Sequence, residues 1–322
     1  MSSLPYLAGE TLRQRPTWRG AVDALIDGHR FPRARITDTT LARGEQRMMS
    51  RLAWIDGLGS AVKSFTVYPE NPRAQPPRPS AQGGCLLLDD ATGAPVAMVE
   101  FSMLTWWKTA ADSVLGALLL GPSEPRSLVI IGAGPVARSL GEAYAALFPS
   151  LERITVCARR LAAASSCTGA LSLDGVELQV SDTPERAVPE ADIVATATTS
   201  SQPVLHGKWL KPGAHVDLVG AYASTMREAD DEVLTRGSVY VDSRATTVEH
   251  IGELMIPLTD GVLKTTDIKG DFYDLLAEET FIDDKRARGD AITVFKNGGG
   301  AHLDLMICKY LQSLTPIAGK GG

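Results

Sequence analysis

The chain has 322 residues, of which 22% are charged, and its formal net charge at pH 7 is −6. This length is sufficient for two domains that each bury a hydrophobic core. The acidic balance argues against nucleic-acid binding and against an anionic membrane surface as a partner, because both need basic protein surface.

Cysteine and histidine usage argues against a protein held together by disulfides and against a metalloprotein. The four cysteines contain no C-x-x-C pair, and the five histidines show no pair at metal-ligand spacing. The N-terminus lacks a signal-peptide pattern, and no apolar run approaches the roughly 18 residues of a transmembrane helix. We therefore expect a cytoplasmic protein with reduced thiols, no metal site and no membrane association.

Residues 1 to about 55 alternate helical patterns with Arg-rich polar stretches. Ala21 to His29 is typical of an amphipathic helix, and Arg33 to Thr39 indicates a strand or a turn.

The next segment, Ala61 to Tyr68, alternates as a β-strand does and places Lys63, Phe65 and Val67 on one face. A lysine on an apolar face is unusual, because burying an ammonium group is costly without an anionic partner. Lys63 is therefore a candidate site residue. The alternative is a lysine that protects an edge strand from aggregation.

A proline-rich loop, Pro69 to Pro79, separates this strand from a predicted hairpin of Cys85 to Asp89 and Pro95 to Phe101. A strong helical pattern then runs from Leu104 to about Leu120 and places Lys108 in its first turn. The helix dipole disfavours a cation there, so an anion is expected beside Lys108. An ordinary helix lysine is the alternative.

The central stretch begins with an apolar run, Ser127 to Ile131, which is typical of a parallel strand buried on both faces. It continues into a G-x-G-x-x-A turn at Gly132 to Ala137, then a helical pattern and a second strand at Arg153 to Ala158. This order predicts a Rossmann-type dinucleotide site, with the diphosphate on the helix N-terminus. A purely structural glycine turn is the alternative.

The three small residues of the turn have separate physical tasks. Gly132 permits the tight turn, Gly134 lets a pyrophosphate approach the backbone, and Ala137 keeps the helix close to the strand.

The end of the second strand bears on the choice of coenzyme. An NAD-binding fold usually places Asp or Glu there, whereas this chain offers Arg159 and Arg160. Guanidinium groups suit a 2′-phosphate, so we expect NADPH (NADP⁺), with NADH used less well. The alternative is a solvated basic turn.

The rest of the chain continues the alternation of strands and helices, with strands expected at Asp192 to Thr196, His215 to Gly220 and Val239 to Asp242. Such alternation predicts an α/β fold with a doubly wound parallel sheet. A glycine-rich turn at residues 297–301 then precedes a final amphipathic helix.

Taken together, the chain resembles the ornithine cyclodeaminase/μ-crystallin family over nearly its whole length. The blocks that carry the resemblance, in order, are Val62-Lys63, Tyr68 to Asn71, Thr92 to Pro95, L-T-x-x-K-T-A-A at 104–111, Ile130 to Ala137, Ala191 to Val194 with Thr196 to Thr198, Arg227-Glu228-x-Asp230, and Phe295 to Asp304.

The resemblance implies a division of the chain into two domains. Residues 121–301 would form the NADP-binding Rossmann domain, and residues 1–120 with 302–322 would form an α+β substrate-binding and dimerisation domain, so a homodimer is expected. The coenzyme-binding residues expected are Gly132, Gly134, Pro135, Val136, Ala137, Arg159, Arg160, Thr196, Thr198 and Gly220.

Family members hold the substrate carboxylate with an arginine from the N-terminal segment, a strand lysine and an arginine in the L-T-x-x-R-T-A-A motif. The resemblance places Lys63 at the strand lysine, and spacing favours Arg35 as the first arginine, with Arg33 as its rival. The motif arginine is replaced here by Lys108, which keeps the charge but loses the bidentate fork. Ser80 is a further substrate-binding candidate.

A second departure concerns the reaction. Cyclodeaminases carry an Asp in the turn before the Glu-x-Asp motif, and alignment on Glu228 and Asp230 puts Tyr222 there. A tyrosine cannot activate water as a carboxylate does. The chain is therefore more similar to the branch that reduces Δ1-pyrroline-2-carboxylate and Δ1-piperideine-2-carboxylate.

The function implied is NADPH-dependent reduction of a cyclic imino acid to L-proline or L-pipecolate. Lys63 is the candidate proton donor to the imine nitrogen, with water second, while Asp304 is either a helix cap or a site residue. Three alternatives stay open: an ornithine cyclodeaminase, an alanine-type amino-acid dehydrogenase, and a non-catalytic NADPH-binding protein of the crystallin kind.

Overall fold

The computed structural model describes residues 4–8, 16–277 and 289–315. The chain divides into two compact units, one formed by Met1–Lys108 with Gly300–Gly322 and the other by Thr109–Gly299. We call them unit 1 and unit 2. Among the helices of the described residues, none is both long and apolar enough to cross a bilayer.

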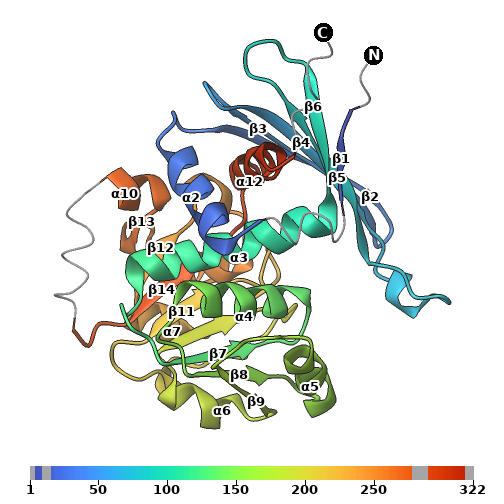
Figure 1. Cartoon of the computed structure of the whole chain (residues 1–322). Coiled ribbons are helices and arrows are strands. Elements are labelled where there is room, and N and C mark those ends of the chain that lie inside the picture. Colours follow the sequence, from blue (N-terminus) through green and yellow to red (C-terminus); the bar gives the residue numbers. More distant parts are fainter. Residues whose placement is uncertain (1–3, 9–15, 278–288, 316–322) are drawn as a thin grey trace. The chain divides into compact units, whose positions relative to one another are not determined.

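Unit 1 is built on a six-stranded sheet in the order β1-β6-β5-β4-β3-β2, in which only the short β1 pairs in parallel with its neighbour (Figure 1). Its strands are β1 (Tyr6–Leu7), β2 (Arg35–Arg43), β3 (Gln46–Ile55), β4 (Gly59–Val67), β5 (Ala81–Leu88) and β6 (Pro95–Glu100). Its helices are α2 (Trp18–His29), α12 (Ala301–Ser313), the first part of α3 (Phe101–Leu120) and the 3-10 turn η1 (Asn71–Arg73).

Strand register decides which side chains of this sheet share a face. Arg51 of β3 lies opposite Lys63 of β4, which lies opposite Cys85 of β5. Because directly opposed residues project to the same side, these three side chains share one face. Helix α12 packs against β3, β4 and β5, and Cys85 and Lys63 are buried.

The other face of the same sheet exposes large apolar side chains. Leu41, Met48, Leu52 and Trp54 are 65%, 47%, 39% and 53% exposed. The register pairs Leu41 with Met48 and Trp54 with Arg35, so these residues form one surface. An exposed apolar patch of this kind is unusual on a protein surface that contacts only solvent.

Unit 2 contains an entirely parallel eight-stranded sheet in the order β13-β12-β14-β11-β10-β7-β8-β9 (Figure 1). Its strands are β7 (Ser127–Ile131), β8 (Arg153–Cys157), β9 (Glu177–Ser181), β10 (Ile193–Thr196), β11 (His215–Leu218), β12 (Ser238–Val241), β13 (Ile268–Gly270) and β14 (Thr293–Lys296). The α-helices are α4 (Pro135–Leu147), α5 (Leu161–Gly169), α6 (Pro184–Ala187), α7 (Asp231–Arg236), α8 (Arg244–Thr247), α9 (Gly252–Thr259) and α10 (Phe272–Ala277), and 3-10 turns are η2 (Val188–Glu190), η3 (Gly207–Trp209) and η4 (Thr265–Asp267).

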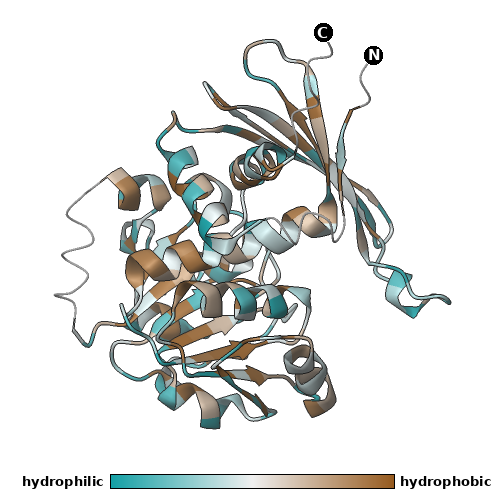
Figure 2. Ribbon diagram, in the orientation of Figure 1, coloured by the Kyte–Doolittle hydropathy of each residue, from teal (hydrophilic) through white to brown (hydrophobic). Residues whose placement is uncertain are grey.

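Hydrophobic strands explain the core of unit 2. Every residue of β7, β10, β11 and β14 is buried, and Figure 2 shows apolar colouring along the central strands. The chain runs from β7 outward through β8 and β9, then returns to β10 on the other side of β7. This reversal is the topological switch point at which doubly wound sheets bind ligands. The predicted α/β Rossmann-type fold is confirmed.

Two local predictions were wrong. Gln46–Ile55 belongs to the segment in which we expected helical patterns, yet it forms strand β3, because it pairs along its whole length with both β2 and β4. Helix α3 begins at Phe101, not Leu104, because the Glu100 carboxylate accepts hydrogen bonds from the N–H groups of Ser102 and Met103. Lys108 therefore lies well inside the helix, and the argument from its first turn does not apply.

Candidate functional site

The turn after β7 has the geometry that dinucleotide binding requires. Gly132 has a φ of +135°, and a Cβ there would lie 2.3 Å from the carbonyl oxygen of Ala197. Gly134 is the N-cap of α4, and a Cβ there would have no atom within 4 Å. Ala137 is fully buried. At Gly132 the neighbouring backbone leaves no room for a side chain. At Gly134 the space at the helix N-terminus is open, as the binding of a pyrophosphate requires.

The end of β8 presents the two predicted arginines to solvent. Arg159 and Arg160 are both exposed, whereas Cys157 is buried and its pKa is raised to about 11. Burial is the main cause of that shift, and the nearby Asp182 and Glu185 add to it. The guanidinium groups are thus accessible to an anion from solvent.

The predicted residues after β10 and β11 make contacts that the sequence did not indicate. The hydroxyls of Thr196 and Thr198 donate to the carboxylate of Glu228 at 2.9 and 2.7 Å, and the N–H of Gly220 donates to the same group at 2.6 Å. Thr196 is completely buried, so its hydroxyl belongs to this network. Pro135 is exposed and Val136 half-buried at the start of α4.

Within unit 1, Lys63 meets a carboxylate. Its Nζ lies 3.0 Å from Oδ1 of Asp304, and the two side chains are 6% and 1% exposed. Asp304 lies in the first turn of α12, where a carboxylate also complements the helix dipole. Gly300 is the N-cap, so Asp304 is a partner of Lys63 and not the cap.

Aromatic rings enclose the ammonium group of Lys63. Its Nζ lies 4.9 Å from the ring centre of Phe101 and 5.8 Å from that of Phe65, and the two rings pack 4.7 Å apart. Ring faces are attractive to a cation. The remaining oxygen of Asp304, Oδ2, has no hydrogen-bond partner among the described residues. One acceptor at this ion pair is therefore left for a donor from outside the described protein.

Two further cations lie near the start of α12. Lys108 is only 5% exposed, and Arg51, opposite Lys63 in the sheet, donates from Nε to Asp38 at 2.9 Å. Both act on His302, whose pKa lies well below its usual range, first because the ring is buried and then because of electrostatic interactions with His29, Lys108 and Arg51. The ring is therefore neutral at pH 7.

The other predicted substrate residues lie elsewhere. Arg35 pairs with Trp54, on the face of the sheet opposite to Lys63, and forms an exposed ion pair with Asp56. Its rival Arg33 is exposed before β2, and Ser80 is exposed before β5. Lys63 contacts Asp304 and Lys108 acts on His302, both near the start of α12, whereas Arg35 and Ser80 are exposed.

Sequence reasoning missed Arg51, Asp304 as the ion partner, and Glu228. The signal for Arg51 was present in principle, because the alternation of β3 would have placed it opposite Lys63 once the strand was recognised. The sequence offers Asp304 as either a helix cap or a site residue but does not mark it as the partner of Lys63, and Glu228 enters there only as part of a family block.

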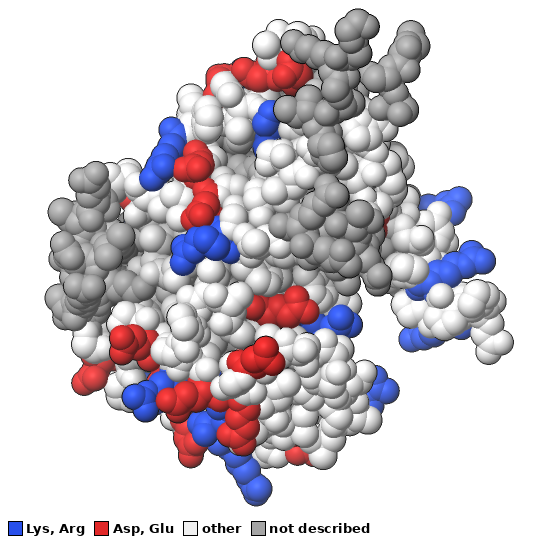
Figure 3. Space-filling view, viewed as in Figure 1, with Lys and Arg blue, Asp and Glu red and all other residues white. Residues whose placement is uncertain are grey.

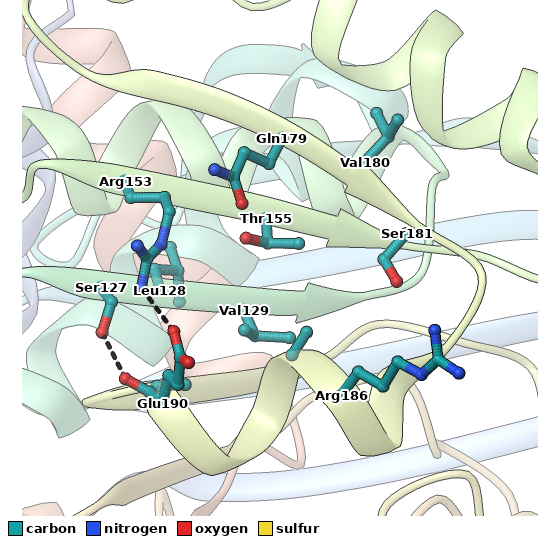
Figure 4. Close-up of a pocket in the computed structure, with 12 residues that line it drawn as sticks. Ser127, Leu128, Val129, Arg153, Thr155, Gln179, Val180, Ser181, Arg186 and Glu190 are labelled. Carbon is teal, nitrogen blue, oxygen red and sulfur yellow. Dashed lines mark hydrogen bonds and ion pairs between the residues drawn. The ribbon is translucent and has the colours of Figure 1, made fainter.

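A separate open pocket of about 360 Å³ lies on unit 2 over β7, β8 and β9. Figure 4 shows Ser127, Arg153 and Glu190 at one end and Ser181 and Arg186 at the other. Its lining contains none of the predicted site residues. The nearby α6 has only four residues, which leaves this part of the sheet incompletely covered.

Charges on the visible surface are mixed. Acidic and basic side chains are interspersed in Figure 3, and the described residues seen in that view form no extended basic patch.

Comparisons with known proteins agree with these features. The family model described as "Ornithine cyclodeaminase/mu-crystallin family" matches residues 32–314. A Delta(1)-pyrroline-2-carboxylate reductase of Paracoccus denitrificans is 49% identical over 314 residues, covering 96% of this chain and 97% of that protein. The ketimine reductase mu-crystallin of Mus musculus is 32% identical over 233 residues, covering 72% of this chain and 69% of that protein.

The fold is shared with a solved structure of known ligands. The Thermococcus litoralis Delta(1)-pyrroline-2-carboxylate reductase, in complex with NADH and L-proline, superposes with a TM-score of 0.86 at 24% identity over 97% of each chain. At this identity the likeness concerns the fold.

Proposed function

The chain belongs to the ornithine cyclodeaminase/mu-crystallin family, and from this premise we propose that it reduces the C=N bond of a cyclic imino acid, Δ1-pyrroline-2-carboxylate or Δ1-piperideine-2-carboxylate, to L-proline or L-pipecolate. The observation that carries the proposal is the buried Lys63–Asp304 pair, together with Arg51 and Lys108, in a chain with a dinucleotide turn. The 49% identical reductase supports the same reaction class.

The cations of unit 1 hold the substrate carboxylate in this proposal. Lys63 pairs with Asp304 and Arg51 pairs with Asp38, while Lys108 is buried in the same unit. A substrate carboxylate bound among these cations would orient the ring, and such positioning contributes several kcal/mol to catalysis. Arg51 takes the place that we had expected Arg35 or Arg33 to fill.

Lys63 also donates the proton in this proposal, with water as the second candidate. The imine nitrogen must be protonated to become a good acceptor, and the ammonium group of Lys63 has protons to give. Asp304 accepts a hydrogen bond from Lys63 and so keeps Nζ at a fixed position. After transfer, the neutral amine regains a proton from solvent, so the residue is restored for the next turnover.

The glycine turn, the N-terminus of α4, and Arg159 and Arg160 would hold the coenzyme. When bound, NADPH supplies the hydride that the C=N carbon accepts. The exposed arginines support NADPH over NADH, because a 2′-phosphate suits guanidinium donors. Gly134 offers the open backbone approach for the diphosphate.

A homodimer is also proposed, through the apolar face of the unit 1 sheet. That face exposes Leu41, Met48, Leu52 and Trp54, which a second copy of the chain would bury. A related archaeal alanine dehydrogenase is described as a dimer. Trp54→Glu should convert the dimer into monomers in sedimentation-velocity experiments, and an unchanged dimer would refute the assignment. The cytoplasmic location remains a prediction.

The test of the activity is the loss of NADPH absorbance at 340 nm with each imine in turn, at mildly acidic and neutral pH. We expect turnover with at least one imine, and the ratio of the two rates gives the ring preference. Lys63→Met should abolish turnover and leave NADPH affinity within about twofold, because Lys63 belongs to unit 1 and not to the dinucleotide turn. No turnover by the wild type, or retained turnover by Lys63→Met, would contradict the proposal.

A matched pair of variants tests the carboxylate grip. Lys108→Met should raise the KM for the imine by roughly tenfold or more, since a charged hydrogen bond is worth about 1.5–3 kcal/mol. Lys108→Arg keeps the charge and should retain most of the affinity. An unchanged KM in Lys108→Met would remove Lys108 from the site.

A further inference from the structure

One buried carboxylate collects the hydrogen bonds of two loops at the carboxyl edge of the parallel sheet. Glu228 is completely buried, and its Oε1 accepts from the N–H of Thr198 at 2.6 Å and from that residue's hydroxyl at 2.7 Å. Its Oε2 accepts from the Thr196 hydroxyl at 2.9 Å and from the N–H groups of Gly220 and Ala221 at 2.6 and 3.1 Å. The loop after β10 and the loop after β11 are thus joined by one side chain.

The first of these loops adjoins the dinucleotide turn. The N–H of Ala197 donates to the carbonyl of Ile131, the last residue of β7, at 2.8 Å. The close approach of Gly132 to Ala197 fixes the same junction. Any movement of the loop after β10 therefore occurs directly beside the coenzyme-binding turn.

The two loops also touch each other at a glycine. A Cβ on Gly220 would lie 2.1 Å from the carbonyl oxygen of Thr198 and 2.6 Å from Oε1 of Glu228. Real side chains do not fit at such distances. The contact that Glu228 maintains is therefore tight enough to require a residue without a side chain.

Two further buried ionisable residues hold Glu228 and the loop after β11 in place. Glu253 accepts hydrogen bonds from the N–H groups of Glu228 and Ala229 at 2.8 and 2.9 Å. Lys296 donates from Nζ to the carbonyls of Leu218 and Ala221 at 2.9 and 2.8 Å, which holds the loop after β11 from its other side. A side chain that only filled space would not need this support.

We propose that Glu228 is a positioning residue for the nicotinamide half of the coenzyme, which is a role beyond the reduction proposed above and rests on its use of a nicotinamide coenzyme. In a doubly wound sheet the dinucleotide lies across the switch point. The adenosine half belongs over β7 and β8, where Arg159 and Arg160 lie, and the nicotinamide half belongs over β10 and β11. Glu228 fixes the loops of that second half.

The chemistry of the donors explains why a carboxylate is required. Three of the five donors are backbone N–H groups, which cannot reverse their direction. A glutamine at this position has one oxygen and one NH₂ group. Its NH₂ group would point at a backbone N–H of one of the two loops, so two hydrogen-bond donors would oppose each other there. Glu228→Gln therefore changes no volume but releases one of the two loops.

The experiment compares a whole coenzyme with its adenosine half. Titration measures the affinity of wild type and Glu228→Gln for NADPH, by fluorescence, and for adenosine 2′,5′-bisphosphate, by calorimetry; NADH and ADP replace them if the wild type prefers NADH. We expect NADPH affinity to fall by roughly tenfold or more, while the affinity for the adenosine half stays within about twofold. Binding is measured without imine, so the result stands even if the wild type reduces no cyclic imine.

Asp217→Asn is the matched control. Asp217 is an equally buried carboxylate of unit 2, but its partners are the hydroxyls of Ser113 and Tyr144, which can rotate to suit an amide. Asp217→Asn should be less stable than the wild type, but its affinities for NADPH and for the adenosine half should change by the same factor. If Glu228→Gln weakens both ligands equally, or neither, the assignment is overturned.

Thr196→Val provides a second variant if Glu228→Gln does not fold. This nearly isosteric change removes one hydrogen bond to Oε2 from a residue that is completely buried. We expect a smaller effect of the same kind: the affinity for NADPH should fall severalfold, and the affinity for the adenosine half should not change. Equal affinities of Thr196→Val and wild type for NADPH would overturn the proposal.

Discussion

Asp304→Asn tests whether the Lys63 ion pair holds unit 1 together. The change removes a negative charge with almost no change in volume, and it leaves the Lys63 ammonium in a site where the lysine side chain is only 6% exposed. We expect a large loss of stability, because an uncompensated buried charge is far more costly than an exposed one.

The separation of the two atoms sets the size of the effect. At 3.0 Å and an effective dielectric constant of about 20, the attraction is about 5–6 kcal/mol before the cost of desolvation. Measured losses on breaking one side of a buried pair are about 3–5 kcal/mol. Removing both charges in Lys63→Met/Asp304→Asn should cost less than either single change, since no buried charge then remains unpaired.

Urea denaturation followed by tryptophan fluorescence measures the free energy of unfolding of each variant. Four of the five tryptophans lie in unit 1, so the signal reports mainly on the unit that contains the pair. Asp56→Asn is the control, because Asp56 pairs with Arg35 while both side chains are more than half exposed, and we expect a change below about 1 kcal/mol. If Asp304→Asn is as stable as this control, or if the double variant is the least stable, the reasoning is refuted.

Changing Arg159 and Arg160 together to Gln should raise the KM for NADPH by roughly 10–100-fold and leave that for NADH nearly unchanged in steady-state kinetics, because a 2′-phosphate loses charged hydrogen bonds; equal effects on both coenzymes would contradict this. Gly134→Ala should abolish coenzyme binding at an unchanged melting temperature, since its Cβ enters open space, whereas Gly132→Ala should lower the melting temperature because its Cβ meets a carbonyl oxygen at 2.3 Å. Burial raises the pKa of Asp217 from 3.8 to about 7, so the folded state binds this proton more tightly, and the free energy of unfolding should fall as the pH rises from about 4 to 7. Asp217→Asn should flatten that slope in thermal melts, and an unaltered slope would count against the assignment.

Local signals explain what could be predicted from the sequence. The glycine turn at Gly132 and Gly134 lies between an apolar strand and an amphipathic helix, so the strand, turn and helix are all specified by near neighbours. The hairpin of β5 and β6 was predictable for the same reason, with Gly93 at a φ of +68° in its loop.

Register and long-range pairing explain what could not be predicted. The side of the sheet on which Arg35 or Arg51 lies depends on how β2, β3 and β4 align, and a shift by one residue would exchange the faces. Lys63 and Asp304 are 241 positions apart, so nothing local marks them as partners. Glu228 reads as an ordinary acidic residue until the loops it joins are seen together.

The central claim, that buried cations hold the carboxylate of a cyclic imine, is tested most directly by removing that carboxylate from the substrate. The wild type is assayed at 340 nm with Δ1-piperideine-2-carboxylate and with Δ1-piperideine, which has the same ring and C=N bond. We predict a kcat/KM at least about 1,000-fold lower for Δ1-piperideine, since two or three charged hydrogen bonds of about 1.5–3 kcal/mol each are lost. Comparable rates with both compounds would contradict the account.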